Sequence, residues 1–220
     1  PSGIKQVTIA YKGRLAINLK ISVDDSAHAS APWLSKNAIE ETMIFSKELK
    51  KGLESDQEKK SKGMLLTATL TEINGGTSHN VTPKECVSTF DIRIPVDTNC
   101  KIVEQKISVL VNEISQRRKV EAYYSIIDET EPFEAPHDSA IVRAFTLGVM
   151  DVEHTRPTLI RKTGTGDMNV IGNQWKIPVV TYGPGDPHQA HTIDERVSID
   201  EYLRGIEILK RMIHHLKRLH

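Results

Sequence analysis

The amino-acid sequence predicts a mixed α/β chain in two parts: a ferredoxin-like βαββαβ sandwich, followed by part of a second, α/β domain. Three observations predict this. From Arg14 to Ile126 the residue patterns follow the order strand, helix, strand, strand, helix, strand, which is the split βαβ order of that sandwich. The pattern changes in a segment that carries Pro132 and Pro136. Beyond it, helices accompany only two short strands, too few for a self-sufficient parallel sheet.

The first part opens with two strand patterns. Large apolar side chains occupy every second position from Leu15 to Val23 without a break, which predicts a strand with one buried face. Val7 and Ile9 predict a shorter strand before it, and Lys12-Gly13 suits the tip of a hairpin. We therefore expect these two strands to pair with each other.

Two helices and three strands complete the first part. A helix begins after Asn37, which has the capping-box spacing to Glu40, and Gly52 ends it. The later elements follow from apolar residues at strand or helix spacing. They are strands at residues 64–73 and 85–94, a helix at 101–117 and a strand at 120–126.

The second part contains a helix around residues 140–149 and short strands at residues 158–161 and 177–182. The last helix opens with Ser198 and Glu201, which have the spacing of a full capping box. Its apolar residues recur at helical spacing, so one face of it should be buried. We therefore divide the chain into domains at residues 1–130 and 131–220.

Composition and charge exclude several classes of protein. The 220 residues carry 29 Lys and Arg against 29 Asp and Glu, whereas a general nucleic-acid binder shows a basic excess. No apolar run approaches the roughly 18 residues that cross a bilayer, so we expect no membrane partner. The two cysteines form no CxxC pair and, without a secretory signal, favour a cytoplasmic location.

Two histidine-containing loops could carry chemistry. His191 lies in the loop 183–195, between a strand pattern and a capped helix, and a neutral imidazole there can ligate zinc. His28 lies among small residues between a strand and a helix and could donate a hydrogen bond to a developing oxyanion. The alternatives are a surface loop whose histidines only cap a helix, and a turn that only ends a strand.

Two further clusters could bind an anion. Arg93 follows the glycine-rich segment 75–83 and shares a strand face with Asp91; an arginine there can grip a carboxylate with two parallel hydrogen bonds. Residues 161–167 offer glycine N–H groups and threonine hydroxyls to an anion, although the P-loop spacing is absent. The alternatives are an Asp91–Arg93 ion pair on a solvated face and an ordinary turn with Asp167 as helix cap.

Together the four clusters resemble the acetylornithine deacetylase, succinyl-diaminopimelate desuccinylase and carboxypeptidase G family of di-metal peptidases. The matching segments occur in the family's order along almost the whole chain. They are His28-Ala-Ser-Ala-Pro32 with Asn37-Ala38, Gly75-Gly76 with Asn80-Val81 and Pro83, Asp91 with Arg93, Thr163 to Asp167, and Gly183, Gly185, Ala190, His191 and Glu195. Within the family, the sequence of residues 161–169 is most similar to that of the lysine/ornithine hydrolases that act on an amino-group carrier protein.

The resemblance implies a fold and a set of roles. The first part would be an α+β lid of ferredoxin-like topology that forms a homodimer, and the second the C-terminal part of a zinc-peptidase catalytic domain. His191 would be a metal ligand, and His28 would stabilise the tetrahedral oxyanion. The implied substrate-binding residues are Asn80, Arg93, Gly164, Thr165 and Gly166, with Arg161 as an additional anion contact that has no firm family match.

The implied activity is metal-dependent amide hydrolysis in lysine or arginine biosynthesis, with two divalent metals, zinc or cobalt, in the complete enzyme. The family's His-x-Asp motif and catalytic Glu-Glu pair are not found in a matching context. We therefore expect that an N-terminal metal-binding part lies outside this chain and that the chain alone is inactive. The alternatives are an acetylornithine or acetyl-lysine deacetylase, another N-acyl amino-acid deacylase or dipeptidase, and a non-catalytic dimerisation fragment.

Overall fold

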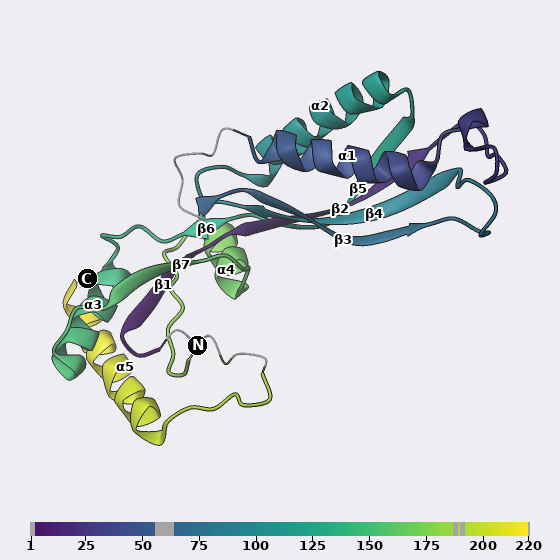
Figure 1. Cartoon of the computed structure of the whole chain (residues 1–220). Coiled ribbons are helices and arrows are strands. Elements are labelled where there is room, and N and C mark those ends of the chain that lie inside the picture. The colour runs from purple at the N-terminus through teal and green to yellow at the C-terminus, as the bar shows by residue number, and fades with distance from the viewer. Residues whose placement is uncertain (1–2, 56–63, 187–188, 190–191, 220) are drawn as a thin grey trace. The chain divides into compact units, whose positions relative to one another are not determined.

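The computed structural model describes residues 3–55, 64–186, 189 and 192–219. The chain divides into two compact units, which we call the central unit, Gly13–Pro132, and the terminal unit, formed by Pro1–Lys12 together with Phe133–His220. Figure 1 shows the elements of both units. None of the described helices is long and apolar enough to cross a bilayer.

The central unit is a four-stranded antiparallel sheet with two helices. Its strands lie in the order β3-β4-β2-β5, and α1 and α2 pack on one face of the sheet (Figure 1). This is the ferredoxin-like arrangement that the element order predicts. The elements are β2 (Gly13–Ser22), α1 (Ala38–Leu53), β3 (Thr67–Gly75), β4 (Glu85–Ile94), α2 (Cys100–Arg118) and β5 (Glu121–Thr130), with a short 3-10 helix, η1 (Pro32–Leu34), before α1.

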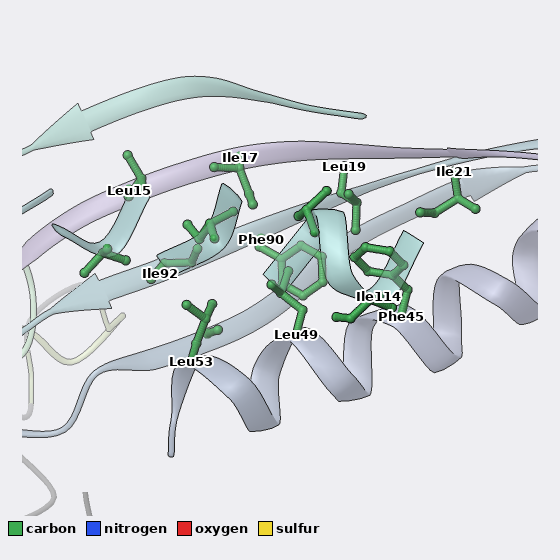
Figure 2. Close-up of a cluster of buried hydrophobic side chains, with 14 of the residues drawn as sticks. Leu15, Ile17, Leu19, Ile21, Phe45, Leu49, Leu53, Phe90, Ile92 and Ile114 are labelled. Atoms are coloured by element: carbon green, nitrogen blue, oxygen red, sulfur yellow. The ribbon is translucent and has the colours of Figure 1, made fainter. Parts of the chain in front are cut away.

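The core of the central unit lies between the sheet and the helices (Figure 2). On β2, Leu15, Ile17 and Leu19 all point to this face, because every second residue of a strand lies on the same side of the sheet. All three side chains are fully buried. Phe45 and Leu49 of α1 meet them one helical turn apart. Burial of each such side chain stabilises the fold by about 1.5–3 kcal/mol. The opposite face of the sheet is left for polar residues.

The terminal unit is an α/β assembly around a three-stranded sheet of order β6-β1-β7. β1 pairs in parallel with β7 and antiparallel with β6. Helices α3 and α5 pack closely at Gly148, where an added Cβ would lie 2.9 Å from the backbone oxygen of Ile208. The elements are β1 (Gln6–Tyr11), β6 (Phe133–Glu134), α3 (Ala140–Glu153), β7 (Thr158–Lys162), α4 (Asp167–Trp175) and α5 (Ile199–Leu219).

The expected hairpin between β1 and β2 is wrong. β1 carries Val7, Thr8, Ile9 and Ala10, which are all fully buried, and a strand buried on both faces needs neighbours and cover on both sides. β7 and β6 supply the neighbours. The first twelve residues therefore belong to the terminal unit, whereas the division at residue 130 had placed them with the central sheet.

Three more expectations for the terminal unit need correction. Residues 177–182 form no strand; Thr181 makes only an isolated bridge to Thr8, with backbone hydrogen bonds of 2.9 and 3.0 Å. The glycine-rich turn leads into the helix α4, as the alternative of a strand-to-helix turn expected, but the N-cap is Gly166, and Asp167 is the first helical residue. The capping box of α5 is half formed: the Glu201 N–H reaches Ser198 Oγ at 3.5 Å, but the Glu201 carboxylate accepts from the Ile4 and Gly185 N–H groups instead.

Candidate functional site

Two loops of the central unit meet at one end of the sheet and bring His28 and Asn80 together. An isolated bridge pairs His28 with Val81. The Ala29 N–H donates to the Asn80 carbonyl at 2.8 Å, and the Thr82 N–H donates to the Ala27 carbonyl at the same distance. Both side chains, distant in the sequence, therefore project from one backbone-bonded platform.

The ring of His28 is held in one tautomer. The backbone N–H of Ser30 donates to His28 Nδ1 at 3.2 Å, and the Ser30 hydroxyl lies 2.8 Å from the same atom. Because Nδ1 accepts from an N–H, the neutral imidazole carries its proton on Nε2. His28 is exposed, so the Nε2–H group can donate a hydrogen bond to a ligand.

Asn80 is oriented in a comparable way. The Ser78 hydroxyl donates to Asn80 Oδ1 at 2.7 Å, which leaves the amide nitrogen with two hydrogens to donate. Asn80 is also exposed. The platform thus presents two neutral hydrogen-bond donors from two adjoining loops, and such donors suit an oxygen that gains negative charge during a reaction.

Arg93 lies at the other end of the same sheet. Ser22 at the end of β2 pairs with Glu85 at the start of β4, whereas Arg93 pairs with Arg14 near the start of β2. Eight residues along a strand separate Glu85 from Arg93, which corresponds to about 27 Å. The structure therefore brings His28 and Asn80 together but does not bring Arg93 to them within one central unit.

The side chain of Arg93 is bound to a carboxylate. Its Nε and Nη2 donate to the two oxygens of Asp91 at 2.6 and 3.1 Å. Arg14 Nε donates to Asp91 Oδ2 at 2.8 Å, and Arg14 Nη1 donates to Asp128 at 2.7 Å. The four side chains form one network on the polar face of the sheet, so the ion pair considered from the sequence exists, with two members that the sequence did not suggest.

In the terminal unit, the glycine-rich segment Gly164-Thr165-Gly166 connects β7 to α4. Asn169 holds it in place and is almost completely buried. Asn169 Oδ1 accepts from the Gly166 N–H at 3.0 Å, and its Nδ2 donates to the Lys12 carbonyl at 3.1 Å. Sequence reasoning missed this role, although an asparagine three residues after a helix cap is a capping-box signal.

Two basic side chains precede this segment. Arg161 donates through Nε and Nη2 to Glu134 Oε1 at 2.9 and 2.6 Å, and its Nη2 lies 2.9 Å from the ring nitrogen of His137. Its suggested role as an anion contact remains a prediction. Burial lowers the pKa of the Lys162 ammonium, which lies 6.0 Å from the centre of the Tyr11 ring.

The predicted metal ligand His191 lies outside the described residues. Among those that are described, Cys100, Glu129 and Glu131 have ligand atoms close enough to share an ion. In the absence of an ion, burial, aided by the two carboxylates, raises the pKa of the Cys100 thiol from 9.0 to about 12. Glu131 also accepts from the Cys100 N–H at 3.1 Å and so caps α2.

Comparisons with known proteins agree with this architecture. A family model described as the peptidase dimerisation domain matches residues 9–119. A metallo-carboxypeptidase of the M20 family from Sulfolobus solfataricus superposes with a TM-score of 0.75 at 16% identity, covering 96% of this chain and 60% of that one. A tripeptidase from Staphylococcus aureus gives 0.79 at 18% identity, covering 99% and 55%. These two likenesses concern the fold.

Relatives found by sequence similarity carry more specific names. A LysW-lysine/LysW-ornithine hydrolase of Saccharolobus islandicus (strain Y.N.15.51 / Yellowstone #2) is 32% identical over 137 residues, which are 62% of this chain and 37% of the relative. A putative hydrolase of the same name from Thermococcus kodakarensis is 40% identical over 94 residues, 43% of this chain and 27% of the relative. The matched regions span well under half the length of these relatives.

Proposed function

Because this chain belongs to the M20 peptidase dimerisation-domain family, we propose that it is part of a metal-dependent amidohydrolase that releases lysine or ornithine from an amino-group carrier protein. LysW, which the names of the relatives join to lysine and ornithine, would be this carrier. One observation in the structure carries the proposal: the backbone-bonded platform from which His28, with its Nε2–H free to donate, and Asn80 both project.

The residues of this chain would act on the scissile amide and on the substrate's charge. When its carbonyl is attacked, the amide oxygen gains negative charge, and His28 Nε2–H would donate to it without first having to reorient. Asn80 would bind the same region of the substrate. Arg93 would bind a carboxylate of the released amino acid, and the backbone of Gly164 to Gly166 would face the substrate in the catalytic domain.

A metal supplies the remaining chemistry when it is bound, since it acidifies a water and polarises the carbonyl. We infer two divalent metals, zinc or cobalt, in the complete enzyme, with His191 as the ligand that this chain provides. A catalytic zinc needs about three protein ligands, so others would have to join His191.

The proposal also assigns a homodimer, because a single copy cannot complete the site. Arg93 lies about 27 Å along β4 from Glu85, at the end of the sheet where the loop of His28 begins, and this is farther than a lysine-sized substrate extends. One end of each central unit would serve one active site and the other end the partner's. The free, buried cysteines Cys86 and Cys100 support a reducing, cytoplasmic location.

The edge strand β3 is the surface we assign to the dimer. Buried and exposed residues alternate along β4, but residues 69–75 of β3 are all exposed, including Leu70 and Ile73. An exposed apolar edge strand invites pairing with another strand. Beside it, a pocket of about 350 Å³ opens between α1 and β3. It is lined by Met43, Ser46, Lys47, Lys50, Thr69, Leu70 and Phe90.

The decisive experiment measures substrate hydrolysis by the full-length gene product that contains these residues. We expect release of lysine or ornithine from the carrier-protein conjugate, and a fall in kcat of about 10²–10³ in His28→Ala with its metal content unchanged. Faster hydrolysis of acetylornithine, another N-acyl amino acid or a dipeptide would favour the alternative substrates. Unchanged kcat in His28→Ala would refute the proposed role of the platform.

A further inference from the structure

We propose that Asp91 is a positioning residue that fixes the guanidinium of Arg93 for a substrate carboxylate, and that Arg14 on the neighbouring strand braces Asp91. This inference rests on the proposed function, in which Arg93 binds substrate. It assigns roles to Asp91 and Arg14 on the polar face of the sheet. Asp91 is the hub, since it accepts from both arginines.

The pattern of hydrogen bonds leaves one edge of Arg93 available. Asp91 takes Nε and one hydrogen of Nη2, at 2.6 and 3.1 Å, which is a bidentate, planar contact. The opposite edge, made by Nη1 and the second hydrogen of Nη2, can still make two parallel bonds to another carboxylate. The Arg93 side chain is 30% exposed, so that edge is open to a ligand. Asp91 thus fixes the plane in which the substrate carboxylate must lie.

Arg14 gives Asp91 a second task. Arg14 and Arg93 are directly opposite each other on β2 and β4, and like charges in this position repel. Asp91 lies between them and accepts from both, while Asp128 on β5 takes the far end of Arg14 at 2.7 Å. The network contains two positive and two negative groups. Removing either carboxylate therefore raises its net charge equally, but only Asp91 touches Arg93.

This symmetry provides a matched pair of variants, Asp91→Asn and Asp128→Asn. If the carboxylates acted only through charge, both variants would attract an anionic substrate more strongly and lower KM. If Asp91 positions Arg93, Asp91→Asn should raise KM about ten-fold, because one of the two acceptor oxygens becomes an NH2 donor that faces a guanidinium donor, and the two guanidinium groups repel. Asp128→Asn should leave KM near the wild-type value. Kinetics of the full-length gene product would measure both, with Arg93→Ala as reference.

NMR spectroscopy of this chain tests the same point without turnover. In the folded chain, the Nε–H resonance of Arg93 should be sharp, and its chemical shift should be displaced by the hydrogen bond to Asp91. It should collapse toward the position of a free arginine in Asp91→Asn but not in Asp128→Asn. Unfolding by urea would show that both variants are folded.

The outcomes separate the two hypotheses. If Arg93→Ala leaves KM unchanged, the proposed function of Arg93 fails. If Arg93→Ala raises KM while Asp91→Asn lowers it or leaves it unchanged, the positioning role is wrong and the proposed function stands. A raised KM and a collapsed resonance in Asp91→Asn alone would establish the inference.

Discussion

Gly164 is a position where a requirement for glycine would come from the substrate and not from the fold. An added Cβ at this position would meet no atom within 4 Å, so the fold does not require a glycine there. A substrate that approaches the backbone closely would require one. The position is therefore a direct probe of whether the segment 164–166 faces a ligand.

We expect Gly164→Ala to change the free energy of unfolding by less than about 0.5 kcal/mol and to raise KM about ten-fold in the full-length gene product. The reversed pattern is expected for Gly172→Ala, whose Cβ would lie 2.2 Å from the Phe133 ring. Such overpacking costs about 1–3 kcal/mol. Urea unfolding and steady-state kinetics of the two variants test this; an unchanged KM in Gly164→Ala would mean that no substrate approaches Gly164.

For single residues, the sequence predicts a position well when the motif that carries it is local. The small residues around His28 predicted that this histidine is accessible, and the structure adds the Ser30 N–H that fixes its tautomer. The sequence placed Asp91 and Arg93 on one strand face, which is correct. It could not foresee Arg14 or Asp128 in that network, because their approach depends on the register of β2 with β4 and β5, a non-local property.

Among the elements, helix α2 shows how burial can overrule a helix dipole. Cys100 is its first residue, where the positive end of a helix ordinarily lowers a thiol pKa. Burial and the neighbouring Glu131 and Glu129 reverse this and raise the pKa to about 12. The folded chain therefore keeps a proton that the unfolded chain loses above pH 9.

This difference predicts a loss of stability in alkali. The contribution of the protonated Cys100 thiol to the free energy of unfolding is fully present below pH 9. It is lost as pH rises toward 12, at up to about 1.4 kcal/mol per pH unit. Cys100→Ser does not titrate there, so it supplies the reference. We expect the difference in unfolding free energy between wild type and Cys100→Ser to shrink between pH 9 and 11 in urea titrations. A constant difference over that interval would contradict the raised pKa.

The start of α1 was predicted from the sequence, whereas its end was not, because the helix continues through Gly52 to Leu53. Asn37 caps α1 as expected, since its Oδ1 accepts from the Ile39 N–H at 3.0 Å. The pairing of β1 was not predicted, because Val7 and Ile9 fit a hairpin strand as well as a central strand. Only the contacts of β1 with residues 158–162, far along the chain, decide between these possibilities.

At the scale of the whole molecule, the two edges of the central sheet differ. β3 and β5 are both edge strands. β5 carries Asp128 and Glu129 at its exposed end, and charged residues protect an edge against pairing. β3 has Leu70 and Ile73 exposed, and Leu70 lines a pocket together with Met43 of α1. The proposed dimer should therefore form through β3, and the acidic end of β5 should stay unpaired.

A pair of variants on the two edges tests this assignment. Leu70→Glu places a negative charge on the β3 edge, where an isologous two-fold interface would bring two such charges together. We expect sedimentation equilibrium at tens of micromolar to show a dimer for the wild-type chain and a monomer for Leu70→Glu. Ile127→Glu makes the same change at an exposed apolar residue of β5 and should remain a dimer. A dimer that survives Leu70→Glu but dissociates in Ile127→Glu would move the interface to β5, and a monomeric wild-type chain would contradict the dimer itself.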